Sequence, residues 1–192
     1  MPLIQKQASG LHGGALLSTS SGKVAVVFSA VVLLAVSARV QIPFWPVPMT
    51  LQTLTVLLIG HFLGFRLAVA TIMAYLFCGA VGLPMFAGTP ERGLGLAYMA
   101  GPTGGYLVGF VAAGAIASQV RDIREKFGAV MVPVVLMSAS IAIHLVGLIW
   151  LSKFVGFENA IQLGVLPFIL GDLLKVGIAT AACFVLPLRH HS

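Results

Sequence analysis

The sequence predicts an all-α integral membrane protein with six transmembrane helices. Of its 192 residues, 59% are hydrophobic and only 8% are charged, which is too apolar for a soluble domain of this size. The apolar residues gather in segments that approach the roughly 20 residues a helix needs to cross a bilayer. We therefore expect one membrane domain over residues 23–192, preceded by a polar tail at residues 1–22.

The six expected spans follow one another along the chain. They are placed at residues 23–42, 51–65, 67–83, 103–120, 129–152 and 166–188. The first ends before a loop with three prolines, which lack the backbone donor that would extend a helix. The second is short, so it is expected to be tilted, kinked or continuous with flanking structure. The fourth repeats a small residue every four positions, at Gly101, Gly105, Gly109, Ala113 and Ala117, which lets another helix approach closely.

The distribution of Lys and Arg predicts the orientation of these spans. The side with both termini carries Lys6, Lys23, Arg66, Arg121, Arg124, Lys126 and Arg189, and the other side carries Arg39, Arg92 and Lys153. Because cytoplasmic loops are enriched in Lys and Arg, both termini are expected in the cytoplasm, with a binding site opening outward. The cations form no basic patch, so the formal charge of +6 does not indicate a nucleic-acid partner.

Two opposite charges interrupt the last expected span. Asp172 and Lys175 lie three residues apart, so they share one helix face and can pair or contact the same polar ligand. Each charge alone costs about 2.5–3.5 kcal/mol or more near the bilayer centre, so such residues face protein or a water-filled pocket. The pair is the main candidate for a binding site. The alternative is a pair that only neutralises itself or lies at the membrane rim.

The expected outer loops supply further candidates. Trp45 lies in a stiff segment with three prolines, where it either lines a site or anchors at the membrane interface. Gln52 places an amide at the start of the second span. Tyr106 lies one turn inside the fourth span, where its phenol points either into a cavity or toward the interface. Phe86 belongs to an apolar loop that leads to Arg92.

Several other chemistries lack their motifs in this sequence. The chain has no Gly-x4-Gly-Lys-Ser/Thr phosphate loop and no clustered Cys and His, so neither ATP hydrolysis nor a metal site is expected. Cys78 and Cys183 lie in apolar segments, where a small buried side chain is the default. Ser140 and His144 lie four residues apart in the fifth span, which leaves an intramembrane hydrolase as an alternative to an interhelical hydrogen bond.

Four blocks, taken in order, resemble one family. They are VPMTLQTL at 47–54, GLPMFAG at 82–88, GPTGGYLVGF at 101–110 and PFILGDLLK at 167–175. Together they resemble the BioY family, the biotin-binding S components of energy-coupling factor (ECF) transporters. The resemblance implies a six-helix ECF S-component-like bundle, without enzymatic activity, that captures biotin near the external face of a bacterial cytoplasmic membrane.

The resemblance also implies partners. An S component works with a transmembrane coupling protein and two ABC-type ATPases, which agrees with the missing phosphate loop, although dedicated partners, a shared module and solitary function all stay open. Small residues of the first span are the candidates for packing on the coupling protein; they are Ala25, Ser29, Ala35 and Ala38. A purely structural membrane subunit remains a further alternative.

With biotin as the ligand and no cofactor, each candidate residue receives a role. Lys175 and Asp172 are expected to meet the ureido group as donor and acceptor, because charged hydrogen bonds of this kind are strong. The remaining contacts are expected from Trp45, Phe86 and Tyr106 on the apolar part of the ligand, Gln52 as an amide and Arg92 at the carboxylate.

Overall fold

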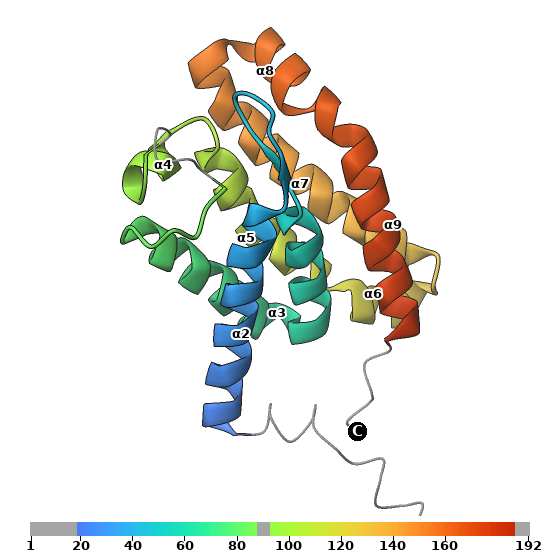
Figure 1. Cartoon of the computed structure of the whole chain (residues 1–192). Coiled ribbons are helices and arrows are strands. Elements are labelled where there is room, and N and C mark those ends of the chain that lie inside the picture. Colours follow the sequence, from blue (N-terminus) through green and yellow to red (C-terminus); the bar gives the residue numbers. More distant parts are fainter. Residues whose placement is uncertain (1–18, 88–92, 187–192) are drawn as a thin grey trace, which may run out of the picture.

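The computed structural model describes residues 19–87 and 93–186, and helices dominate it (Figure 1). The helices are α2 (Ser20–Arg39), α3 (Gln52–Ala80), α4 (Leu96–Ala100), α5 (Gly104–Ala117), α6 (Val120–Phe127), α7 (Met131–Val155), α8 (Phe157–Gly164) and α9 (Ile169–Val185), with the 3-10 helix η2 (Leu166–Phe168) before α9. Strands β1 (Gln41–Ile42) and β2 (Met49–Thr50) pair in antiparallel fashion.

Four segments of the described chain are long and apolar enough to cross a membrane. They are Ser20–Arg39, Gln52–Ala80, Met131–Val155 and Phe157–Val185. The fold is therefore that of a mostly helical multi-pass membrane protein, as the composition predicts. Four such segments are fewer than the six expected spans, for two reasons. Helix α3 is one continuous segment over the expected second and third spans, and α5, in the expected fourth span, has only 14 residues.

Helix α3 contains the expected second and third spans without a loop between them. Gly64 interrupts it with φ 70° and ψ 173°, a left-handed backbone that glycine adopts without the steric cost of a Cβ. In Figure 1 the two halves of α3 are inclined to one another, and the second half leads toward α4. Of the expected alternatives for the short second span, the structure therefore shows a span that continues into the next one, with a sharp break at one glycine.

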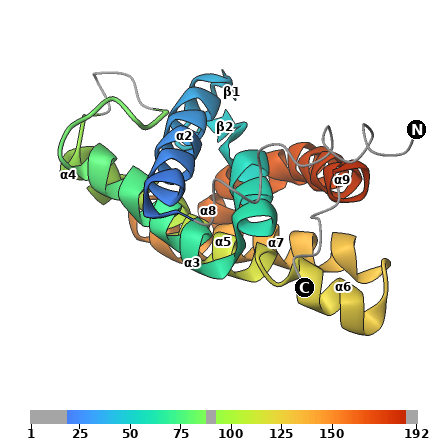
Figure 2. The same cartoon turned by 90° about the horizontal axis from the view of Figure 1, so that it is seen from below.

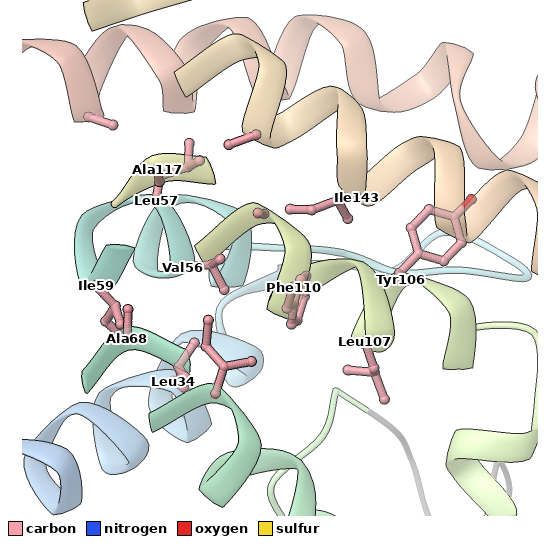
Figure 3. Packing of buried hydrophobic residues seen from close by; sticks show 14 of the residues in the cluster. Leu34, Val56, Leu57, Ile59, Ala68, Tyr106, Leu107, Phe110, Ala117 and Ile143 are labelled. Carbon is pink, nitrogen blue, oxygen red and sulfur yellow. The ribbon is translucent and has the colours of Figure 1, made fainter. Parts of the chain in front are cut away.

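The small-residue stripe of α5 packs against α7, as predicted. A Cβ built on Gly109 would lie 2.8 Å from Ile143 Cα, closer than real Cβ contacts allow. The stripe therefore brings the two backbones together. Buried side chains from α2, α3, α5 and α7 complete the core around this contact (Figure 3). In Figures 1 and 2 the first half of α3 lies between α2 and α9, so α3 links the helices at the two sides of the bundle.

Some short elements were not expected from the sequence. The first span ends at Arg39, three residues early, because Gln41 and Ile42 pair with Thr50 and Met49. Helices α4, α6 and α8 occupy segments that were assigned to connections. Of the expected N-terminal tail, residues 1–22, the first 18 residues lie outside the described part of the chain. Helix α2 begins at Ser20, where the Thr19 hydroxyl accepts a hydrogen bond from the Gly22 N–H.

Two glycines test the contact between α5 and α7. Gly109→Ala is expected to lower the free energy of unfolding by about 1–3 kcal/mol, because the added methyl overpacks the helix interface. Gly177→Ala in α9 is the matched control, since a Cβ there meets no atom within 4 Å. It should leave stability unchanged or raise it by up to about 1 kcal/mol. Unfolding of the detergent-solubilised variants measures both, and equal effects at the two positions would contradict the packing argument.

Candidate functional site

A cavity lies between the β1–β2 hairpin and helices α3, α5, α7 and α9. The room enclosed between its lining atoms is small, about 30 Å³, and the cavity opens to the surroundings. Its lining combines apolar and aromatic side chains with several hydroxyls, one amide, one imidazole and one ammonium group. The lining residues are Val47, Pro48, Thr50, Gln52, Thr53, Ala87, Tyr98, Thr103, Tyr106, Leu107, Phe110, Ile143, His144, Phe168 and Lys175.

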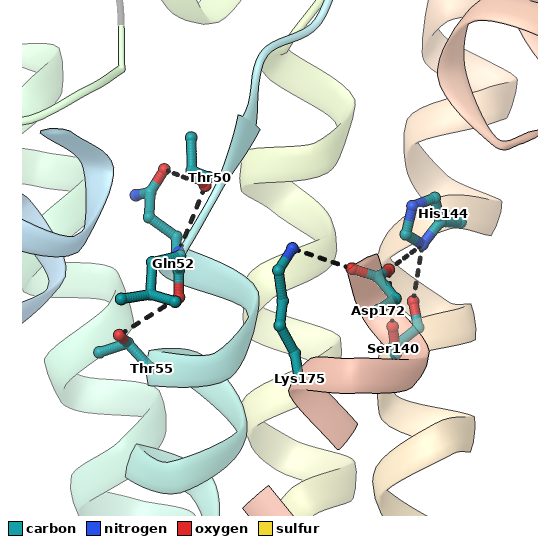
Figure 4. A network of polar contacts seen from close by, with 8 residues as sticks. Thr50, Gln52, Thr55, Ser140, His144, Asp172 and Lys175 are labelled. Carbon is teal, nitrogen blue, oxygen red and sulfur yellow. Dashed lines mark hydrogen bonds and ion pairs between the residues drawn. The ribbon is translucent and has the colours of Figure 1, made fainter. Parts of the chain in front are cut away.

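The charged pair of α9 forms the centre of a buried polar network (Figure 4). The Lys175 Nζ donates a hydrogen bond to Asp172 Oδ1 at 3.0 Å, and the Ser140 Oγ donates to Asp172 Oδ2 at 3.0 Å. The His144 Nδ1 lies 3.4 Å from the same Oδ2 and 3.1 Å from the Ser140 carbonyl oxygen. Both carboxylate oxygens are therefore occupied by donors from α7 and α9, which compensates the cost of burying the charge.

The two partners of this ion pair face different surroundings. Lys175 lines the cavity described above, whereas Asp172 lines a second, mostly apolar cavity of about 300 Å³, together with Ser140 and His144 of α7. Both residues are buried, with relative exposures of 7% and 5%. Asp172 is the one hydrogen-bond partner of Lys175 among the described residues, and an ammonium group carries three donors. Lys175 therefore has donor capacity left for a ligand, while Asp172 holds the ammonium group in place.

A second chain of hydrogen bonds fixes the cavity wall at the start of α3. The Gln52 Nε2 donates to the Tyr75 hydroxyl at 2.6 Å, and this hydroxyl donates to the Met85 carbonyl at 3.0 Å. The Thr50 hydroxyl donates to Gln52 Oε1 at 3.2 Å. Gln52 thus ties β2 to the loop that follows α3. Its amide orientation is set before any ligand arrives.

Aromatic side chains build the apolar part of the wall. The Tyr106 hydroxyl donates to the Gly164 carbonyl at 2.8 Å, so its ring rather than its hydroxyl faces the cavity. The Tyr106 and Phe168 rings stack with centroids 6.4 Å apart. On the other side Tyr98 stacks on Phe86 at 5.3 Å. Phe86 is buried behind Tyr98 and does not line the cavity.

The structure brings some of the predicted site residues together and separates others. Lys175, Gln52 and Tyr106 line the cavity. Asp172 and Phe86 support lining residues from behind. Trp45 is 71% exposed and is not among the residues that line the cavity. Arg92 lies outside the described residues.

Sequence reasoning missed several lining residues. These are Thr53, Tyr98, Thr103, Phe110, Ile143, His144 and Phe168. Thr53, Thr103, Phe110 and Phe168 belong to the four blocks quoted above, which is the signal that could have indicated them. Tyr98, Ile143 and His144 lie outside those blocks, and only the packing of the helices brings them to the cavity.

The structure does not form a serine–histidine dyad from Ser140 and His144. The Ser140 hydroxyl donates to Asp172, and the His144 ring contacts the Ser140 carbonyl oxygen instead of its hydroxyl. A nucleophile requires a base within hydrogen-bond reach of its own hydroxyl. The two residues therefore form an interhelical hydrogen-bond network, the alternative that the sequence left open.

The small residues of α2 divide between two faces. Ala25 and Ser29 are exposed, so they are available to a partner helix. Ala38 is fully buried and Ala35 packs against the core. In this structure the Ala38 side chain therefore contacts other residues of the same chain.

Fold and cavity together define a class of protein. The chain is a mostly helical multi-pass membrane protein with a small cavity that is lined by both polar and aromatic side chains. Residues 8–189 match the model of the BioY family. This chain belongs to the BioY family, as the four blocks indicated.

Individual relatives agree with this assignment. The probable biotin transporter BioY of Pyrococcus horikoshii is 41% identical over 82% of this chain and 91% of its own length. The biotin transporter BioY of Thermotoga maritima is 34% identical over 77% and 85%. A crystal structure of the S-component for biotin from an ECF-type ABC transporter matches the fold with a TM-score of 0.76. At 20% identity, it covers 94% of this chain and 96% of that one.

The ion pair allows a test of its role in stability. Asp172→Asn is expected to destabilise the protein by about 3–5 kcal/mol, because it leaves the Lys175 ammonium group buried without a counter-charge. The double variant with Lys175→Met should recover most of this loss, since no unpaired charge remains. Thermal unfolding of the single and double variants in detergent measures the coupling. Additive losses would mean that the two charges do not depend on each other.

Proposed function

We propose that this chain is the substrate-binding S component of an ECF-type transporter and that its ligand is biotin. The observation that carries the proposal is the Lys175 ammonium group, which is buried, held by Asp172 and directed into the cavity. Membership of a family whose relatives are named as biotin transporters supports the choice of ligand. The chain binds and carries its ligand and performs no chemical step on it.

The ureido group of biotin suits the polar end of the cavity. It presents one carbonyl acceptor between two N–H donors. Lys175 donates to the carbonyl oxygen, while Asp172 acts through Lys175 instead of touching the ligand. A hydrogen bond from a charged group contributes about 1.5–3 kcal/mol, so this contact accounts for much of the selectivity for a ureido ligand.

The apolar part of biotin suits the aromatic wall. The sulfur-containing ring packs against Tyr106 and Phe168 on one side and Tyr98 on the other. Gln52 lines the same cavity, and its amide is held in orientation by the hydrogen bond to Tyr75. Trp45 and Phe86 act indirectly, Phe86 by supporting Tyr98. Arg92 in the outer loop is the proposed partner of the ligand carboxylate.

The proposed topology has six membrane spans, with both termini in the cytoplasm of a bacterial cell and the cavity near the external face. The two halves of α3 act as separate spans around Gly64, and α5 crosses as a short, buried span. Helix α6 carries Arg121, Arg124 and Lys126, which supports a cytoplasmic position for it, because cytoplasmic loops are enriched in Lys and Arg.

The energy for transport comes from other chains in this proposal. The sequence contains no phosphate loop, so a transmembrane coupling protein and two ABC-type ATPases are the proposed partners. The exposed face of α2 around Ala25 and Ser29 is the proposed contact with the coupling protein, because small residues let a second helix approach closely.

Biotin binding is the first test of this function. The purified protein in detergent should bind biotin, and Lys175→Met should weaken binding by about tenfold or more, because a charged hydrogen bond is lost. Lys153→Met is the matched control, since this exposed lysine lies over the Trp150 ring, outside the cavity. Isothermal titration measures all three proteins. Absence of biotin binding by folded wild-type protein would refute the assignment.

The α2 surface makes a second prediction. Ala25→Leu is expected to reduce biotin uptake in cells that supply the coupling protein and ATPases, because the larger side chain separates the two helices. Biotin binding by the purified variant should stay at the wild-type level. Ala181→Leu, on the exposed surface of α9, is the control and should retain uptake. If both variants transport normally, the coupling protein does not dock on this part of α2.

A further inference from the structure

His144 lies at the junction of the polar network and the cavity. Its ring belongs to the cavity lining, and its Nδ1 atom contacts two oxygens of the network. The ring is held on its other sides by edge contacts with Tyr106 at 6.0 Å and Phe168 at 5.6 Å. His144 is therefore fixed in orientation by four neighbours, on α5, α7, η2 and α9.

The chemistry of those contacts assigns the protonation of the ring. The Ser140 carbonyl oxygen and the Asp172 carboxylate oxygen are both acceptors, so the Nδ1 atom between them must carry a hydrogen. In a neutral imidazole the other nitrogen, Nε2, then presents a lone pair. Figure 4 shows this second nitrogen turned toward the side of the network on which the Lys175 ammonium group lies. In its neutral form the ring therefore offers an acceptor beside the donor of Lys175.

Two acceptors of the site are already engaged in hydrogen bonds. The Asp172 carboxylate already accepts from Lys175 and Ser140 and does not line the cavity. Gln52 Oε1 already accepts from Thr50. A ureido ligand brings two N–H donors, and leaving a buried donor without a partner costs binding free energy.

We propose that His144 Nε2 accepts a hydrogen bond from one ureido N–H of the ligand, next to the Lys175 contact with the ureido carbonyl. The inference rests on the proposed biotin function. It changes the role expected of Asp172, which orients both Lys175 and His144 while His144 supplies the acceptor that the ligand meets. The site then contacts a carbonyl oxygen and an adjacent N–H together, which distinguishes a urea, or an amide with its N–H on that side, from an ester.

Two substitutions separate the functions of the two ring nitrogens. In His144→Asn the amide nitrogen takes the place of Nδ1 and can still donate to Asp172, but no group replaces Nε2. In His144→Gln the longer side chain can place an amide oxygen near the Nε2 position. Biotin affinity is therefore expected to fall about tenfold in the Asn variant and to stay within about threefold of wild type in the Gln variant, in line with one neutral hydrogen bond.

Ligand analogues make the test independent of how well the variants fold. Two lactam analogues of biotin each replace one ureido N–H with CH2 at nearly the same size. With wild-type protein, one of the two should bind about tenfold more weakly than the other, since a single N–H meets His144. With His144→Asn that difference should disappear, because the acceptor is gone. This is a double-mutant cycle between ligand and protein.

The outcomes separate this inference from the function on which it rests. Suppose that wild-type protein binds biotin but has equal affinity for the two lactams, or that the difference in affinity between the lactams persists in His144→Asn. In either case His144 is not the acceptor. If the Asn and Gln variants lose affinity equally, the ring acts only through packing and the inference is overturned. If folded wild type binds no biotin, the proposed function fails as well.

Discussion

The buried ion pair of α9 is the constraint on which the binding end of this molecule depends. In an apolar chain, Asp172 and Lys175 are costly unless every lone pair and donor finds a partner. Ser140 and His144 of α7 supply those partners on the carboxylate side. The requirement to satisfy one carboxylate therefore fixes the register of α9 against α7, and the same contacts direct the Lys175 ammonium group into the cavity.

Close helix packing makes that register possible. Gly109 lets α5 approach the α7 backbone, and Gly147 of α7 leaves room for the Tyr106 ring of α5. Because the ring is held between helices, its hydroxyl reaches the Gly164 carbonyl at the end of α8. Gly109 and Gly147 thus position the Tyr106 ring. Close helix packing at small residues therefore fixes this part of the cavity wall.

The sequence predicted what depends on local pattern and failed where tertiary packing decides. The class of protein, the packing of the small-residue stripe and the importance of Asp172 and Lys175 follow from composition and spacing. Which of the two charges faces the cavity does not, because it depends on the α7 side chains that reach Asp172. Trp45 shows the same limit, since a proline-rich loop fixes the backbone without fixing which way the ring points.

The order of elements connects the two ends of the proposed transport subunit. Helix α2, the proposed docking element, continues through β1 and β2 into α3, and this hairpin carries the cavity residues Thr50 and, between its strands, Val47. Arg39 at the end of α2 also donates a hydrogen bond to the Pro84 carbonyl in the loop after α3. A ligand whose binding shifted the hairpin would therefore shift α2 as well, and a partner that shifted α2 would then change ligand affinity by the same factor.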